Sequence, residues 1–231
     1  MDPEFSRLVD EAAGISTSGR WAAVNEKIEK LTAKPGAGNE WWVQLFGALS
    51  FRIFSEYLLL KRAYEEKEKE KETALIAWRA RNLLELSVWC VYCSKSKENA
   101  RRFYEDAGRD VLGIFDAFAR WGTATGQDPR WLDDIAEGKK DISKQAVSDG
   151  IASLDGPFKE VREAAEEVGL GVHFKVGYRM LSKVAHPTAM QVLGTRNDLQ
   201  NDTFFSQGCL CFAGAFQAVE GQLLQAALDS K

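Results

Sequence analysis

Four side chains that could bind an anion or transfer a proton lie close together late in the sequence. They are Tyr178, Arg179, Ser182 and His186, and Pro187 follows directly. Arg179 and His186 are seven positions apart, which places them on nearly the same line of a helix with Ser182 between them. Because proline disfavours helical geometry at the residue before it, we expect His186 at the C-terminal end of this helix.

The predicted position of His186 suggests a chemical role. Exposed carbonyls at a helix C-terminus favour the protonated imidazole, which suits a general acid or a ligand for phosphate. Arg179 would add a positive charge, and Ser182 and Tyr178 would add hydroxyl groups. The alternative interpretation is that His186 only caps the helix and bonds a backbone carbonyl.

Arg81 and Glu85 form a second polar pair on a helix that is otherwise apolar. They are four residues apart, so they share a helix face and can form a local ion pair. Because most of the circumference of this helix is apolar, part of the pair should face protein. A half-buried Arg–Glu pair is costly unless other groups complete its hydrogen bonds. We therefore expect Arg81, Glu85 and Tyr178 to form a supporting polar network, with the group of residues at 178–186 as the partner of the Arg–Glu pair.

Motifs for several common chemistries are missing. The sequence has no Walker loop, no His-Glu-x-x-His motif and no Gly-x-Ser-x-Gly motif. Cys90-x-x-Cys93 could be half of a zinc site, a redox pair, or two small core residues. No second Cys-x-x-Cys or His-x-His motif supplies further ligands, so the core interpretation is favoured. The sequence predicts neither a metal nor a cofactor.

The two polar groups also carry a resemblance. Arg81-x-x-x-Glu85 and the later motif Tyr-Arg-x-Leu-Ser-x-x-x-His-Pro (residues 178–187) resemble a widespread bacterial family catalogued only as a domain of unknown function, over about residues 40–225. More distantly, the helical pattern is similar to the HEPN group (higher eukaryotes and prokaryotes nucleotide-binding). Many members of that group are metal-independent ribonucleases of toxin and phage-defence systems, with an Arg-x-x-x-x-His signature that is usually paired across a dimer.

The HEPN resemblance implies roles for these residues. His186 would act as general acid or base at the ribose 2′-hydroxyl or the leaving oxygen, and Arg179 would stabilise the charge on the phosphorane. Arg81 and Glu85 would position them. The spacing differs from the group's signature, because six residues lie between Arg179 and His186.

Apolar periodicity predicts helices throughout and no strand pairs, so the expected fold is all-α: a bundle of long antiparallel helices with shorter helices outside it. Ser18, Asn39 and Thr73 are candidate N-caps, and Asp128-Pro129 indicates another helix start. The charged run at 65–72 (EEKEKEKE) indicates a solvated helix end or hinge, or else an interaction site. Inward positions of the helix at 97–121 would include Val111, Ile114 and Phe118. The expected helices span residues 21–31, 40–64, 74–94, 97–121, 129–137, about 138–155, 157–168, 172–186 and 203–228.

Bulk composition sets wider limits. The 231 residues are 45% hydrophobic with a net charge of −4, which gives no global electrostatic case for nucleic-acid or membrane binding. Residues 1–5 resemble vector-derived sequence, so we expect a single helical domain over residues 6–231, with its core bundle at about 40–228. With no signal peptide and no apolar run of about 18 residues, the expectation is a cytoplasmic protein that does not enter the membrane.

Two functional interpretations remain open. One is a HEPN-like module that cleaves RNA or binds a nucleotide, with a second copy of the chain or another protein as further candidate partners. The other is a non-catalytic helical interaction domain, in which Arg81, Glu85, Ser182 and His186 form a structural polar network. The sequence does not decide whether the protein is an enzyme.

Overall fold

A computed structural model describes residues 3–33, 40–66, 72–151, 153–186 and 198–229. These residues form helices and contain no strand, which confirms the predicted all-α class. The chain divides into two compact units, the first comprising Met1–Ser96 with Val161–Lys231 and the second Lys97–Glu160. The helices are α1 (Pro3–Thr17), α2 (Arg20–Thr32), α3 (Glu40–Glu65), α4 (Thr73–Lys95), α5 (Lys97–Thr125), α6 (Pro129–Ser148), α7 (Val161–Glu167), α8 (Gly171–Ala185) and α10 (Asp198–Asp229).

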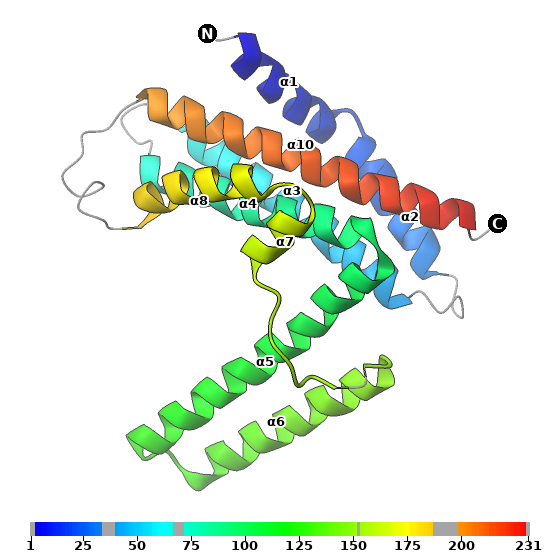
Figure 1. The fold of residues 1–231 in the computed structure, drawn as a ribbon, viewed down its shortest axis with the longest axis vertical. Helices are drawn as coiled ribbons and strands as arrows, with labels where there is room; N and C mark the ends of the chain where they lie inside the picture. Colours follow the sequence, from blue (N-terminus) through cyan, green and yellow to red (C-terminus); the bar gives the residue numbers. More distant parts are fainter. Residues whose placement is uncertain (1–2, 34–39, 67–71, 152, 187–197, 230–231) are drawn as a thin grey trace. The chain divides into compact units, whose positions relative to one another are not determined.

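The centre of the first unit is a layer of three long helices. Figure 1 shows α10 running along α4, with α3 beside them. The ring of Phe212 on α10 stacks on Tyr57 of α3, with centroids 4.2 Å apart. An ideal Cβ placed on Gly208 of α10 would clash with the Leu60 side chain and would lie 3.5 Å from the Cα of Ala80. This glycine allows α10 to approach both neighbours closely.

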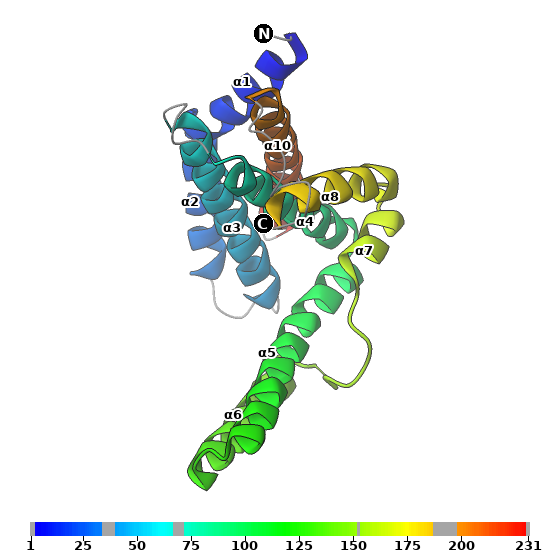
Figure 2. The same cartoon turned by 90° about the vertical axis from the view of Figure 1, so that its left-hand side faces the viewer.

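Shorter helices cover this central layer. In Figure 2, α8 lies against α4 with α7 next to it, and α1 and α2 pack on α10 and α3. The stacked rings of Trp21 and Phe54 join α2 to α3, with centroids 4.2 Å apart. This is the predicted architecture of long central helices with shorter ones outside.

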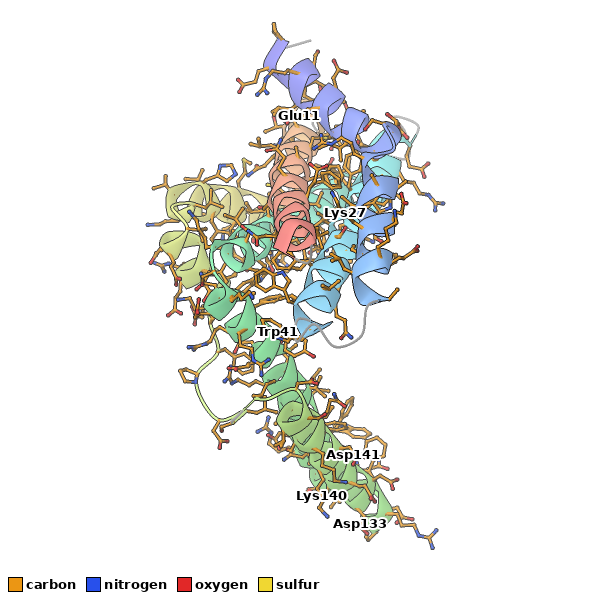
Figure 3. All side chains as sticks on the ribbon, turned by 90° about the vertical axis from the view of Figure 1, so that its right-hand side faces the viewer. Glu11, Lys27, Trp41, Asp133, Lys140 and Asp141 are labelled. Carbon is orange, nitrogen blue, oxygen red and sulfur yellow. The ribbon has the colours of Figure 1, made fainter. Side chains whose placement is uncertain are left out.

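The second unit is a hairpin of α5 and α6, which lie side by side (Figures 1 and 2). Gly126 ends α5 with a positive φ of 67°, and the Asp128 side chain caps α6 by accepting from the backbone N–H of Arg130. Its buried residues are mixed: Arg109 and Asp106 of α5 form an ion pair of 2.6 Å, and Ala100, Ile135 and Ala146 are apolar. Figure 3 shows the side chains along this hairpin and labels Asp133, Lys140 and Asp141, which are all exposed on α6.

Four sequence-based predictions about the second unit were wrong. The predicted helices at 129–137 and 138–155 are one helix that ends at Ser148, and the chain at 157–160 is not helical. The helix predicted to end at 121 continues to Thr125, because Gly122 fits against the indole of Trp131 without breaking it. The expected inward positions Val111, Ile114 and Phe118 are exposed.

Helix caps and ends were the other source of error. The N-cap of α2 is Gly19 in the left-handed region, not Ser18, and α4 begins after Glu72 without a side-chain cap. α1 was not predicted, and its buried residues are Ala12 and Ile15. The last helix begins five residues earlier than predicted, at Asp198. Asn39, the predicted cap of α3, and most of the charged run at 65–72 lie outside the described residues.

α3 is also the described helix that is long and apolar enough to cross a membrane by length and composition. Half of its most apolar 18-residue window is buried inside the fold. The core helix of a soluble protein meets the same criterion, so α3 alone is weak evidence for a membrane span.

Candidate functional site

Four of the six predicted site residues meet where α8 packs on α4. The Arg81 guanidinium on α4 contacts three side chains: Nε donates to Glu85 at 3.1 Å, Nη2 donates to the hydroxyl of Tyr178 at 2.7 Å, and Nη1 lies 2.7 Å from His186 Nε2. Its Cζ also lies over the Tyr178 ring, 4.5 Å from the centroid. We call these four residues the Arg81 cluster.

Local packing explains why α8 comes close enough to α4 for these contacts. Leu181 and Phe174 of α8 are buried. Between them, Gly177 faces Leu84 of α4, and an ideal Cβ on Gly177 would lie 3.2 Å from that side chain and would clash with Gln207. The absence of a side chain at 177 therefore brings the backbones together and lets Tyr178 reach across to Arg81.

His186 lies at the end of α8, as predicted, and is exposed. Its backbone is extended (φ −105°, ψ 152°), so it is the C-cap, and its N–H donates to the Ser182 carbonyl at 3.3 Å. A guanidinium can only donate, so His186 Nε2 must be the acceptor of the Arg81 contact.

Arg179 does not belong to the Arg81 cluster. It is exposed and lines an open groove between α8 and α10 together with Lys175 and Lys183. The prediction that Arg179 and His186 act together rested on their shared line along a straight helix. Helical geometry ends at Ala185, so the shared line does not extend to His186. The extended backbone of His186 directs its imidazole towards α4.

Ser182 lies beside the Arg81 cluster without joining it. Its Oγ is buried and, among the residues that the structure describes, has no hydrogen-bond partner. The predicted network therefore includes Arg81, Glu85, Tyr178 and His186 but excludes the Ser182 hydroxyl.

A second polar cluster was missed from the sequence. Glu56 of α3 is buried, with a side chain that is 1% exposed, and its carboxylate accepts from Arg79 Nη1 at 3.1 Å. Arg52 Nη2 lies 2.9 Å from the same carboxylate, and Asn82 Nδ2 donates to it at 3.4 Å. The available signal was a carboxylate within the apolar run of α3. We call these residues the Glu56 cluster.

The cysteines are core residues. Cys90 and Cys93 are fully buried, which confirms the favoured interpretation of that pair. Burial also raises the pKa of Cys209 and of Cys211 to about 12, so the thiolates that bind zinc or exchange disulfides are scarce at neutral pH. Within the described part of the chain, no group of three or more His, Cys, Asp or Glu side chains could hold a metal ion.

Comparison with protein families gives one match. A model described as "Family of unknown function (DUF5677)" matches residues 58–203, which include the whole Arg81 cluster and Arg79 but not Glu56. A search of the curated proteins and a search of the solved structures each returned no match. The matched segment covers more than half of the chain, and the protein therefore belongs to this family of unknown function, DUF5677.

Proposed function

We propose that the protein is a metal-independent RNA-cleaving module in which His186 moves a proton and Arg81 stabilises the phosphate. The observation that carries the proposal is the 2.7 Å contact between an exposed imidazole and a guanidinium from a different helix. These two groups supply what cleavage next to a ribose 2′-hydroxyl requires, which is a proton acceptor and a fixed cation for the charge that develops on phosphorus.

Phosphate binding and base activation are coupled in this proposal. Arg81 Nη1 occupies the lone pair of His186 Nε2 in the free protein. A phosphate oxygen that accepts from Nη1 would release this lone pair. Nε2 then takes the proton of the 2′-hydroxyl, the 2′-oxygen bonds to phosphorus, and the bond from phosphorus to the 5′-oxygen breaks. The departing oxygen receives a proton from the imidazolium, leaving a 2′,3′-cyclic phosphate and a 5′-hydroxyl.

The other cluster members position Arg81. Glu85 holds Nε and the Tyr178 hydroxyl holds Nη2, so the guanidinium plane is fixed while Nη1 faces His186. The role that the HEPN resemblance assigned to Arg179 thus passes to Arg81. The resemblance supports a bacterial, cytoplasmic, HEPN-like ribonuclease, and a second copy of the chain remains a candidate partner.

Incubation of the protein with structured RNA in EDTA tests the proposal. The wild type should release fragments ending in a 2′,3′-cyclic phosphate, and His186→Ala should abolish their release. The chain has two histidines, so His173→Ala is a matched control: this residue is exposed on the same helix, outside the cluster. Equal cleavage by wild type and His186→Ala, or no cleavage by either, contradicts the proposal.

A second candidate function is supported by the contacts that Arg81 makes within the chain. All three nitrogens of its guanidinium contact groups of the same chain, as a purely structural network joining α4 to α8 would require. In that case His186→Ala should lower the free energy of unfolding without altering any RNA-dependent signal. Measuring stability and cleavage on the same variant separates the two functions.

A further inference from the structure

The groove between α8 and α10 is a second feature that could bind a ligand, and it lies outside the Arg81 cluster. It has a volume of about 890 Å³. Val176, Met180 and Val184 of α8 and Phe204 of α10 contribute its apolar surface. Val172 and Val176 are 81% and 63% exposed, which is unusual for two valines one turn apart on the same helix face.

The residues of α8 along this groove form two parallel rows. The apolar row has one residue at every fourth position: Val172, Val176, Met180 and Val184. The cationic row has the same spacing, and each of its residues directly precedes one of the apolar row: Lys175, Arg179 and Lys183. Rows with a spacing of four residues are the ridges that helices use when they pack on one another. The surface of α8 that faces the groove therefore has the form of a helix-packing face.

The charge of this face is one-sided. α8 carries Lys175, Arg179 and Lys183 and no carboxylate, although the chain as a whole has a net charge of −4. Among the groove-lining residues that the structure describes, none is acidic. From Lys175 to Lys183 the row extends about 12 Å along the helix axis.

We propose that this groove binds an acidic amphipathic helix of a protein partner. An apolar ridge of the partner would pack against Val176, Met180 and Phe204, and carboxylates at intervals of four residues would meet the row of cations. Charge complementarity makes this choice of partner specific. A partner helix with the same apolar ridge but basic residues beside it would be repelled by the cations of α8. The inference is independent of RNA cleavage and uses no residue of the Arg81 cluster.

Other ligand classes match the groove less well. An amphiphile with a single carboxylate needs one cation, whereas this groove offers three in a row. Single-stranded RNA could use all three, but sequence-tolerant RNA binding also needs accessible rings on which bases stack. The groove's ring belongs to Phe204, which is 3% exposed.

The test uses a synthetic alanine-based helical peptide with three leucines spaced four residues apart and a glutamate preceding each. Fluorescence anisotropy of the labelled peptide should show saturable binding to the full-length protein. Binding should weaken at least tenfold in a variant with Lys175→Glu, Arg179→Glu and Lys183→Glu. A control variant with Arg7→Glu, Lys30→Glu and Arg62→Glu changes the net charge equally at exposed positions of the same unit and should bind as the wild type does.

A methyl spectrum of ¹³C-methionine-labelled protein locates the binding site. The Met180 signal, assigned from Met180→Leu, should shift as the peptide is added. A peptide with lysines in place of the glutamates should not bind. The proposal is overturned by equal binding to the groove and control variants, by no binding, by equal binding of the lysine peptide, or by displacement of the peptide with single-stranded RNA. It is also overturned if the chain alone forms a dimer that the groove variant disrupts, because the occupant is then a second copy.

Discussion

Arg79 and Arg81 lie two residues apart on α4 and belong to clusters of opposite character. Arg79 reaches the buried carboxylate of Glu56 on α3, which Arg52 and Asn82 also contact. Arg81 points to the other side of α4, where its partners include the exposed His186 at the end of α8. A step of two residues rotates a side chain by about 200° around a helix, so α4 supports two unrelated polar sites.

The difference between the clusters lies in which group is buried. In the Glu56 cluster the anion is enclosed, and all its known contacts are with cations and an amide of the same chain. In the Arg81 cluster the cation is half-buried and its partner His186 faces solvent. Removing one partner of a buried ion pair leaves an uncompensated charge and destabilises the fold, whereas an open pair leaves a group that a ligand can reach. Substitutions in the two clusters should therefore separate stability from function.

The largest expected effect is for Glu56→Ala. Removing the carboxylate leaves Arg79 and Asn82 without their acceptor beside the core, so we expect the free energy of unfolding to fall by about 3–5 kcal/mol. Urea denaturation measures the change. Glu65→Ala is the control, since Glu65 is exposed near the end of the same helix, and it should change stability by less than about 0.5 kcal/mol. A loss at Glu56 as small as the control's would mean that this cluster is solvated.

Arg81→Met should lower stability less than Glu56→Ala does, and it should abolish RNA cleavage. Methionine keeps much of the apolar stem but leaves the Tyr178 hydroxyl and Glu85 without their shared donor, which should cost about 1–3 kcal/mol. RNA cleavage should be lost at temperatures where the variant is still folded. Arg79→Met provides the contrast: it should lower stability, while its folded fraction still cleaves. If both variants cleave when folded, Arg81 has no role in the reaction.

Glu85→Ala should cost less than about 1 kcal/mol. The Glu85 side chain is 32% exposed, and ion pairs that water can reach contribute little. The loss should shrink further in 1 M NaCl, which screens the pair. Thermal unfolding at low and high salt checks this, and a loss independent of salt would place the pair in a drier environment.

The Arg81 cluster shows how far the sequence can predict this site. Spacing placed Arg81 with Glu85 and His186 at a helix end, because both depend only on local helical geometry and on Pro187. Spacing could not show that Arg179 lines the groove between α8 and α10, because that depends on the side of α8 on which α10 lies. Nor could it pair Glu56 with Arg79, because the contact depends on how α3 packs against α4. The fold class followed from periodicity. The hairpin of α5 and α6 was only partly predicted, because it leaves apolar positions of α5 such as Ile114 and Phe118 exposed, and apolar spacing indicates such positions as inward.

His186→Ala should change stability by no more than about 0.5 kcal/mol, because the imidazole is exposed and its loss opens no core cavity. Together with the loss of cleavage, this would make His186 a residue that serves the reaction and contributes little to the fold. Denaturant unfolding of this variant beside His173→Ala gives the comparison. A cost of 2 kcal/mol or more would favour the structural network over the ribonuclease.

Ser182→Ala is expected to have the smallest effect, and the effect should be favourable. The Ser182 hydroxyl is buried without a partner among the described residues, so removing it relieves a desolvation penalty, and alanine is also the better helix former. Stability should rise by a few tenths of a kcal/mol. Cleavage should be unchanged, because no hydrogen bond joins this hydroxyl to the Arg81 cluster. A loss of cleavage at full stability would instead mean that Ser182 turns towards the site when RNA binds, which would extend the open cluster by one residue.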